Sequence, residues 1–262
     1  MTVLLRALGL CALFLALPAH AATDPLAQGT EDHEAQLIGW SSDEKRFALR
    51  LYLRDAAITD GSHTDPVACE GYLTNEGNPL HGGLVVLVYE RGRLLSTFPI
   101  YDREKCTPPE ESKKRQEAAQ KKLDALGIKL DARGQTFIPQ FNGPTLTVNQ
   151  GPQAPFTFEF EERLQGTTTH PKSGEARGTS EQELYLRKGE TRQKVLTRKV
   201  PFSYSTRMTG ARKAALDRVF VSPSGNTLVV LSNEFVANMA SRRKSLRLMG
   251  VLGWSGGTLK PL

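Results

Sequence analysis

Four consecutive residues near the N-terminus, Glu31, Asp32, His33 and Glu34, carry side chains that could ligate a metal ion. A zinc site takes about four such ligands, commonly drawn from two separated clusters. No second cluster follows at ligand spacing. We therefore interpret these residues as a solvated acidic patch and predict no metal ligand in this chain.

The segment Gly253-Trp254-Ser255-Gly256-Gly257 matches the Gly-x-Ser-x-Gly pattern of a nucleophile elbow. That motif places its serine on a sharp turn before a helix, and the acid and histidine of the triad follow later in the chain. Only residues 258–262 follow Gly257. The pattern therefore predicts no nucleophile here.

His170 and the carboxylates of Glu159, Glu161 and Glu162 could serve acid–base chemistry. A general base must be held and oriented, but His170 lies in a polar stretch without a sequence-local partner. The three glutamates belong to a predicted strand and are expected to face solvent. Phosphate-loop and dinucleotide-binding motifs are also absent from the sequence. We predict no catalytic and no cofactor-binding residue, and no cofactor.

Aromatic residues are the remaining material for a binding site, because aromatic side chains often anchor interfaces. Trp40 precedes the turn of a predicted strand, so core packing is favoured for it over display at a surface. The candidates for an aromatic binding patch are Trp40, Tyr52, Tyr72, Tyr101 and Trp254.

Residues Met1–Ala21 have the pattern of a secretory signal peptide. Arg6 supplies the basic flank, Leu8–Leu17 the apolar segment, and Ala19-His20-Ala21 the small-residue cleavage site. We predict cleavage between Ala21 and Ala22, and no membrane span in the mature chain. The localisation predicted is therefore periplasmic or secreted.

The charge of the chain is modest. The formal net charge is +6, and removal of the leader takes away Arg6 and leaves +5. This excess lacks the clustered basic stripe of nucleic-acid binders, so we predict no nucleic-acid partner.

Two cysteines remain after the predicted cleavage, Cys69 and Cys106. An isolated pair in an oxidising compartment favours a disulfide. The alternative is a metal site, for which His63 and His81 would have to supply the other ligands.

The segment Leu37–Arg54 predicts a turn at Ser41–Lys45 and then a half-buried antiparallel strand. Phe47, Leu49 and Leu51 share one face of that strand with Leu53, and the other face carries Ala48, Arg50, Tyr52 and Arg54. Leu84–Ile100 predicts a hairpin that begins with a continuous aliphatic run.

One amphipathic α-helix is predicted at about 108–126. Thr107 and Glu110 have the spacing of a capping box, with Pro108 at the first helical position. Gly127 suits the left-handed position that ends a helix.

The C-terminal half predicts further strands. Phe156, Phe158 and Phe160 alternate with polar residues, which indicates a strand, whereas Gln165–Ser180 is expected to be a mobile loop. Thr209–Leu216 is expected to form a short helix. The fold class predicted is mainly β, with sequential antiparallel hairpins in a partial propeller-like or β-sandwich arrangement, and a single β-rich domain at 22–262.

The turn Ser41-Ser42-Asp43-Glu44-Lys45 resembles the Ser-Pro-Asp-Gly-Lys turn of blade repeats in β-propellers of the WD40 and TolB type. Ser222-Pro223-Ser224-Gly225 resembles it too. The order of elements is also similar to an uncharacterised family of predicted secreted bacterial proteins, a domain of unknown function. That similarity rests on the leader, the Gly39-Trp40-Ser41 turn, the hairpin and the helix, and it implies no activity.

These features favour an exported, non-catalytic, β-rich binding or assembly module of the bacterial cell envelope. Its partner would be an unidentified protein or an envelope polymer. Two alternatives remain open: a hydrolase of envelope polymers whose catalytic residues assemble only in the fold, and a structural subunit of a secretion or surface complex.

Overall fold

The computed structural model describes residues 23–31, 33–53, 84–102, 107–139, 143–205, 211–237 and 242–262. In these ranges the chain is mainly β, and every strand pairing is antiparallel. Neighbours along the chain pair as hairpins, as the sequence predicts. The strands form three sheets, which we call the outer, central and helix-side sheets.

The central sheet has six strands in the order β1-β14-β13-β12-β7, with β15 also pairing with β14. Both of its faces are buried: on β13, Leu228 and Val230 pack against the outer sheet, while Val229 and Leu231 pack against the helix-side sheet. A strand covered on both faces reads as a continuous aliphatic run rather than an alternating one. The strands are β1 (Thr30–Glu31), β7 (Gln135–Phe137), β12 (Ala211–Val221), β13 (Thr227–Ala237), β14 (Arg242–Ser255) and β15 (Thr258–Pro261).

The outer sheet has the order β11-β10-β9-β8, and its inner face carries Phe156, Phe158 and Phe160. The expectation of a loop over Gln165–Ser180 is wrong, because β9 and β10 continue through it and leave only a short connection at the hairpin tip. Cross-strand backbone hydrogen bonds form there although Ala176 is the one buried apolar side chain in the segment. The strands are β8 (Thr145–Val148), β9 (Phe156–Thr169), β10 (Glu175–Lys188) and β11 (Thr191–Ser205).

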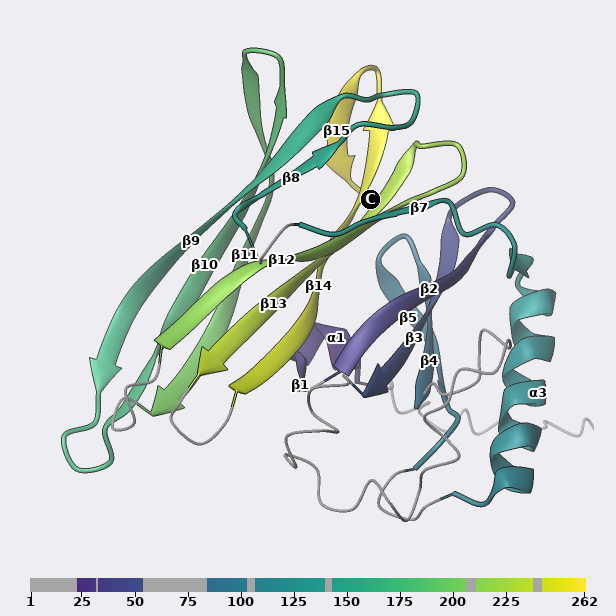
Figure 1. Ribbon diagram of the computed structural model, residues 1–262, viewed down its shortest axis with the longest axis horizontal. Helices are drawn as coiled ribbons and strands as arrows, with labels where there is room; N and C mark the ends of the chain where they lie inside the picture. The colour runs from purple at the N-terminus through teal and green to yellow at the C-terminus, as the bar shows by residue number, and fades with distance from the viewer. Residues whose placement is uncertain are drawn as a thin grey trace, which may run out of the picture.

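The helix-side sheet has the order β5-β4-β3-β2-β6, and helix α3 packs on its far face. The stack therefore runs outer sheet, central sheet, helix-side sheet and helix (Figure 1). The strands are β2 (His33–Ser41), β3 (Arg46–Leu53), β4 (Val85–Glu90), β5 (Arg93–Pro99) and β6 (Ile128–Lys129).

Strand β3 is buried on both faces, so the expectation of a half-buried strand is wrong. Phe47, Leu49 and Leu51 face the central sheet as expected, but Ala48 on the opposite face is also fully buried. The cause is the helix, which covers that face.

Helix α3 spans Pro109–Ala125, close to the predicted 108–126. Its start differs from the predicted capping box: Pro108 is the N-cap residue and no side chain caps the helix. The hydroxyl of Thr107 instead accepts a hydrogen bond from the backbone N–H of Asp102 at 2.7 Å. At the other end Gly127 adopts φ +71°, as its predicted role requires.

The segment at the start of the described residues is anchored to the fold. Asp24 caps the short helix α1 (Pro25–Gln28) and accepts a hydrogen bond from the Tyr89 hydroxyl at 2.8 Å. The Leu26 side chain is 0% exposed in the core between the central and helix-side sheets. Burial of this one side chain fixes the start of the described chain.

The two turns that resemble each other in sequence adopt matching hydrogen-bond patterns. The hydroxyl of Ser41 accepts from the N–H of Arg46, and the hydroxyl of Ser222 accepts from the N–H of Thr227, five residues on in each case. The fourth residue of each turn has positive φ, +55° at Glu44 and +78° at Gly225. The prediction that Ser41, Asp43 and Lys45 form a turn is confirmed.

The segment predicted as a helix at Thr209–Leu216 is strand from Ala211, where β12 begins, so that prediction is wrong over the part described. Pairing with β13 over its whole length decides the conformation of β12. Several predicted features lie outside the described residues: the leader with its cleavage site at Ala21 and Ala22, Cys69 and Cys106 with the disulfide proposed for them, and His63, His81 and Tyr72.

Candidate binding site

The layer between the outer and central sheets changes from apolar to polar along its length. Aliphatic and aromatic side chains fill it near the β12–β13 turn. Toward the end where β13 finishes and β14 begins, the inward positions carry polar side chains. Every second residue of each strand still points inward there, but these residues are polar instead of apolar. These inward residues are Glu162, Ser180, Gln182 and Arg198 of the outer sheet and Arg212, Ser232, Glu234 and Arg247 of the central sheet.

Arg212 is the centre of this polar layer, with a side chain that is 0% exposed. It pairs with Glu162 of the outer sheet and with Glu234 of its own sheet, at 2.6 Å in each case. Burial lowers the pKa of the guanidinium, but these two carboxylates outweigh it, so the pKa lies above its ordinary value. Arg212 therefore stays charged and ties the two sheets together.

Glu162 points inward, contrary to the expectation that it faces solvent. Its carboxylate accepts hydrogen bonds from the Ser180 hydroxyl and from the backbone N–H of Ala214, at 2.5 and 2.9 Å. Burial raises the pKa of this carboxyl, but these bonds and Arg212 outweigh it and hold the pKa below its ordinary range. The carboxylate thus accepts from the backbone N–H of Ala214 at the edge of β12. Such N–H groups lack a partner when an edge strand has no neighbour.

Arg247 lies beside this network on β14. One of its terminal nitrogens donates to the carbonyl of Ala27 at 3.3 Å, while its Nε is buried and has no hydrogen-bond partner among the described residues. Burial lowers the pKa of the guanidinium, and Glu234 opposes this by raising it. Glu234 is therefore close enough to act on Arg247 electrostatically, yet the two form no ion pair.

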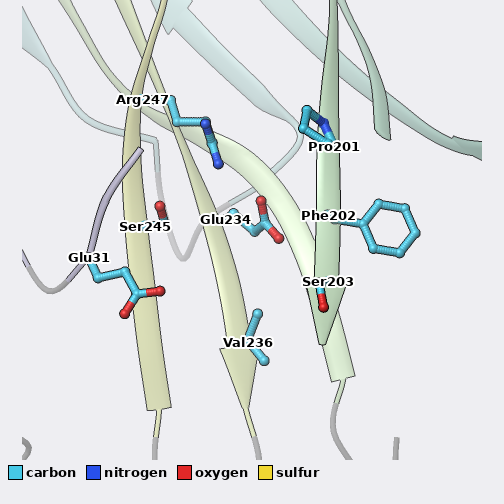
Figure 2. Close-up of a pocket in the computed structure, with 8 residues that line it drawn as sticks. All are labelled: Glu31, Pro201, Phe202, Ser203, Glu234, Val236, Ser245 and Arg247. Atoms are coloured by element: carbon cyan, nitrogen blue, oxygen red, sulfur yellow. The ribbon is translucent and has the colours of Figure 1, made fainter. Parts of the chain in front are cut away.

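A pocket of about 140 Å³ opens between β11 of the outer sheet and the face of the central sheet. Figure 2 shows the guanidinium of Arg247 and the carboxylate of Glu234 pointing into it, while the ring of Phe202 turns away. That ring packs against Arg212 instead, 4.6 Å from the guanidinium carbon. The pocket is lined by Glu31, Pro201, Phe202, Ser203, Glu234, Val236, Ser245 and Arg247.

The same layer contains further polar atoms without partners in the described chain. Arg212 Nη2, Gln182 Oε1 and Ser232 Oγ are buried and unpaired, in addition to Arg247 Nε. Ser232 stands directly across from Arg247 in the strand register. Buried polar groups are nearly always hydrogen-bonded, so the described residues alone leave this layer incompletely satisfied.

A second polar network lies on the opposite face of the central sheet. Asp217, at a β-bulge of β12, accepts from Arg218 at 2.6 Å, from Lys244 at 2.5 Å and from Asn233 at 3.3 Å. Burial raises the pKa of this carboxyl, but Arg218 and Lys244 outweigh it and hold the pKa below its ordinary value. Arg218 also donates to the carbonyl of Ala35 on the neighbouring sheet at 2.8 Å. This arrangement is a structural clamp between sheets.

The N-terminal acidic cluster does not assemble as one site. His33 Nδ1 contacts the backbone carbonyl of Glu31 at 2.5 Å, Glu34 accepts from Tyr52, and Glu31 lines the pocket. Asp32 lies outside the described residues. The part of the chain that the structure describes holds no group of three or more residues suited to a metal ion.

The four described candidates for an aromatic patch do not gather in one place. Trp40 is fully buried in the core between the central and helix-side sheets, as expected, and Tyr101 is also buried. Trp254 packs edge-on against Phe156 in another core, and Tyr52 donates its hydroxyl to Glu34.

The remaining chemical candidates lie apart from the pocket. Ser255 ends β14, and Gly256 and Gly257 form the turn into β15, so no helix follows the elbow-like pattern. His170 is at the exposed tip of the β9–β10 hairpin, where its Nδ1 accepts from the N–H of Ser173 at 3.1 Å.

Arg212, Glu234, Ser245 and Arg247 do not appear among the sequence candidates. The sequence does contain a usable signal for three of them. If the alternation of β13 and β14 is continued beyond their aliphatic residues, Glu234, Ser245 and Arg247 fall on inward faces.

No helix in the described ranges is long and apolar enough to cross a membrane. No protein-family model matches the chain, and neither a curated protein nor a solved structure matches it.

Proposed function

We propose that this chain is an exported, non-catalytic binding module of the bacterial cell envelope, and that its ligand site is the pocket between β11 and the central sheet. The observation that carries this proposal is the pair Arg247 and Glu234, two opposite charges that line the pocket, point into it (Figure 2) and form no ion pair with each other. Hydrogen bonds to charged groups contribute about 1.5–3 kcal/mol, so a ligand that pairs with these side chains gains affinity. Export rests on the predicted leader.

The electrostatics of the polar layer favour binding over hydrolysis. A general acid needs a carboxyl whose pKa is raised toward neutrality. Glu162 is shifted the other way by Ser180, Ala214 and Arg212, and it is fully occupied as an acceptor. Its role is to hold the sheets and the pocket wall in place.

A thermal-shift screen tests the proposal. The mature chain is heated with amino acids, sugars, sugar phosphates and soluble fragments of envelope polymers. Because a ligand at 100 times its Kd stabilises the folded state by about 2.7 kcal/mol, we expect at least one compound to raise the Tm by several degrees. The same compound should have no effect on Arg247→Gln, whereas Arg163→Gln, on the exposed face of the outer sheet, should respond like the wild type.

Two outcomes of this screen would count against the proposal. One is that no compound raises the Tm, and the other is that Arg247→Gln responds as strongly as the wild type. Release of smaller fragments from the polymers during incubation would favour the envelope-polymer hydrolase instead.

A further inference from the structure

The pocket presents a guanidinium and a carboxylate that form no ion pair with each other. In the described chain Arg247 donates to the carbonyl of Ala27, and one oxygen of the Glu234 carboxylate accepts from Arg212. Glu31 adds a second carboxylate to the lining. Arg247 and Glu234 point into the same space (Figure 2). Their separation exceeds the 4.0 Å of an ion pair, although each lies within the electrostatic reach of the other.

The scaffold prevents these two charges from collapsing together. Arg212 holds Glu234 at 2.6 Å from one side, and the carbonyl of Ala27 holds a terminal nitrogen of Arg247 at 3.3 Å from the other. Gly29 lies directly over Arg247, so closely that an added Cβ would stand 2.6 Å from its guanidinium carbon. Fixed charges that cannot move toward each other are preorganised for a ligand that supplies both counter-charges.

We infer that the pocket binds a small zwitterion of the α-amino acid class, with the ligand carboxylate on Arg247 and the ligand ammonium group on Glu234. This inference rests on the proposed function and names the ligand of the same site. A guanidinium suits a carboxylate because its planar N–H donors match the two carboxylate oxygens. The hydroxyl of Ser245, which also lines the pocket, is a further donor for the same carboxylate.

The dimensions of the pocket select a small ligand. A cavity of about 150 Å³ holds a molecule the size of benzene, and this pocket has about 140 Å³. Glycine and alanine are of that size. Val236 and Pro201 supply the apolar surface of the lining and would contact the methyl group of alanine.

Isothermal titration of the mature chain with matched probes tests this assignment. Alanine carries both charges, propionate only the negative one and ethylammonium only the positive one. We expect alanine to bind, and both singly charged probes to bind at least tenfold more weakly, since each makes only one of the two ionic contacts. Arg247→Gln should weaken alanine binding at least tenfold, and Arg163→Gln should not change it.

A second variant guards against loss of folding in Arg247→Gln. Val236→Phe adds bulk to the pocket wall and leaves every charge in place, so it should abolish alanine binding while circular dichroism reports a folded chain. Propionate binding as tightly as alanine, alanine binding unchanged in either pocket variant, or no binding by alanine and glycine would each overturn the zwitterion assignment. If the thermal-shift screen nevertheless yields another ligand that depends on Arg247, the binding function stands and only the ligand class is wrong.

Discussion

Glu44 and Ser224, which are 180 positions apart, are joined by two hydrogen bonds: the Glu44 carboxylate accepts from the Ser224 hydroxyl at 2.5 Å and from its backbone N–H at 2.7 Å. Ser222 donates a third bond to the same carboxylate at 2.6 Å. The two turns that share a sequence pattern are thus in direct contact, and they hold the helix-side sheet to the central sheet. Glu44 occupies the position where the related turn has Gly225, and it adopts positive φ there.

Glu44 has two opposite effects on stability: its carboxylate joins the two turns, and its positive φ strains the backbone. Two substitutions separate these effects. Glu44→Ala should lower the free energy of unfolding by about 1–3 kcal/mol, because the charged acceptor is lost while the strained φ remains. Glu44→Gly loses the same bonds but relieves the strain, so it should be about 1 kcal/mol more stable than Glu44→Ala. Urea unfolding of the two variants measures this difference. Equal stability of Glu44→Ala and the wild type would mean that the contact between the turns contributes nothing.

The N-terminal segment provides a second prediction. Leu26→Ala should destabilise the fold by about 2–5 kcal/mol, because it leaves a cavity in a fully buried site. Leu95→Ala is the matched control, since Leu95 is 45% exposed. If both variants unfold at the same urea concentration as the wild type, the N-terminal segment is not part of the core.

Neighbouring glutamates on β9 test the polar layer. Glu162→Gln should cost about 3 kcal/mol, because it leaves the buried guanidinium of Arg212 without one of its two carboxylates. Glu161→Gln removes the same charge from the exposed face and should cost less than about 1 kcal/mol. Thermal unfolding of both variants measures the two losses of stability. A larger loss in Glu161→Gln than in Glu162→Gln would show that Glu162 is not the glutamate that points into the layer between the sheets.

Asp217 gives the stability a defined pH dependence. Its pKa in the folded chain is below the ordinary 3.8, so the ionised carboxylate stabilises the fold above that pH. This contribution is lost as the pH falls below about 3.8 toward the lower folded-state pKa. Asp217→Asn should cost about 3–5 kcal/mol at neutral pH and should lose less stability on acidification than the wild type.

Urea unfolding between pH 7 and pH 2.5 measures that slope. The exposed Asp131→Asn variant is the control and should follow the wild-type curve. A slope in Asp217→Asn as steep as that of the wild type would assign the acid sensitivity to other groups.

The local elements could be predicted from the sequence because their signals are local. Alternation of Phe156, Phe158 and Phe160 indicates a strand, and Gly127 marks the end of the helix. The long β9–β10 hairpin could not be predicted, because its polar tip is stabilised by backbone pairing rather than by apolar side chains. The burial of Ala48 depends on a helix that comes some sixty residues later in the chain.

The candidate site is hard to predict from the sequence for a different reason. Composition identifies Arg212, Glu234 and Arg247 only as charged residues, which are rarely buried unless paired. Alternation along the strands gives their inward positions, but Glu162 and the β11 wall of the pocket come from another sheet. Only the stacking of the outer sheet on the central sheet brings Glu162 to Arg212 and β11 to Arg247.

NMR spectroscopy can observe Arg247 directly in solution through the nitrogen-15 resonance of its Nε–H group. This resonance is the one that disappears from the spectrum of Arg247→Gln. Addition of alanine should shift this resonance in a saturable manner, because the ligand carboxylate binds the guanidinium to which this nitrogen belongs. The Nε–H of Arg163, on the exposed face, should not move. If the Arg247 resonance stays in place while alanine and the other small-molecule ligands are added to saturation, the pocket is not a binding site.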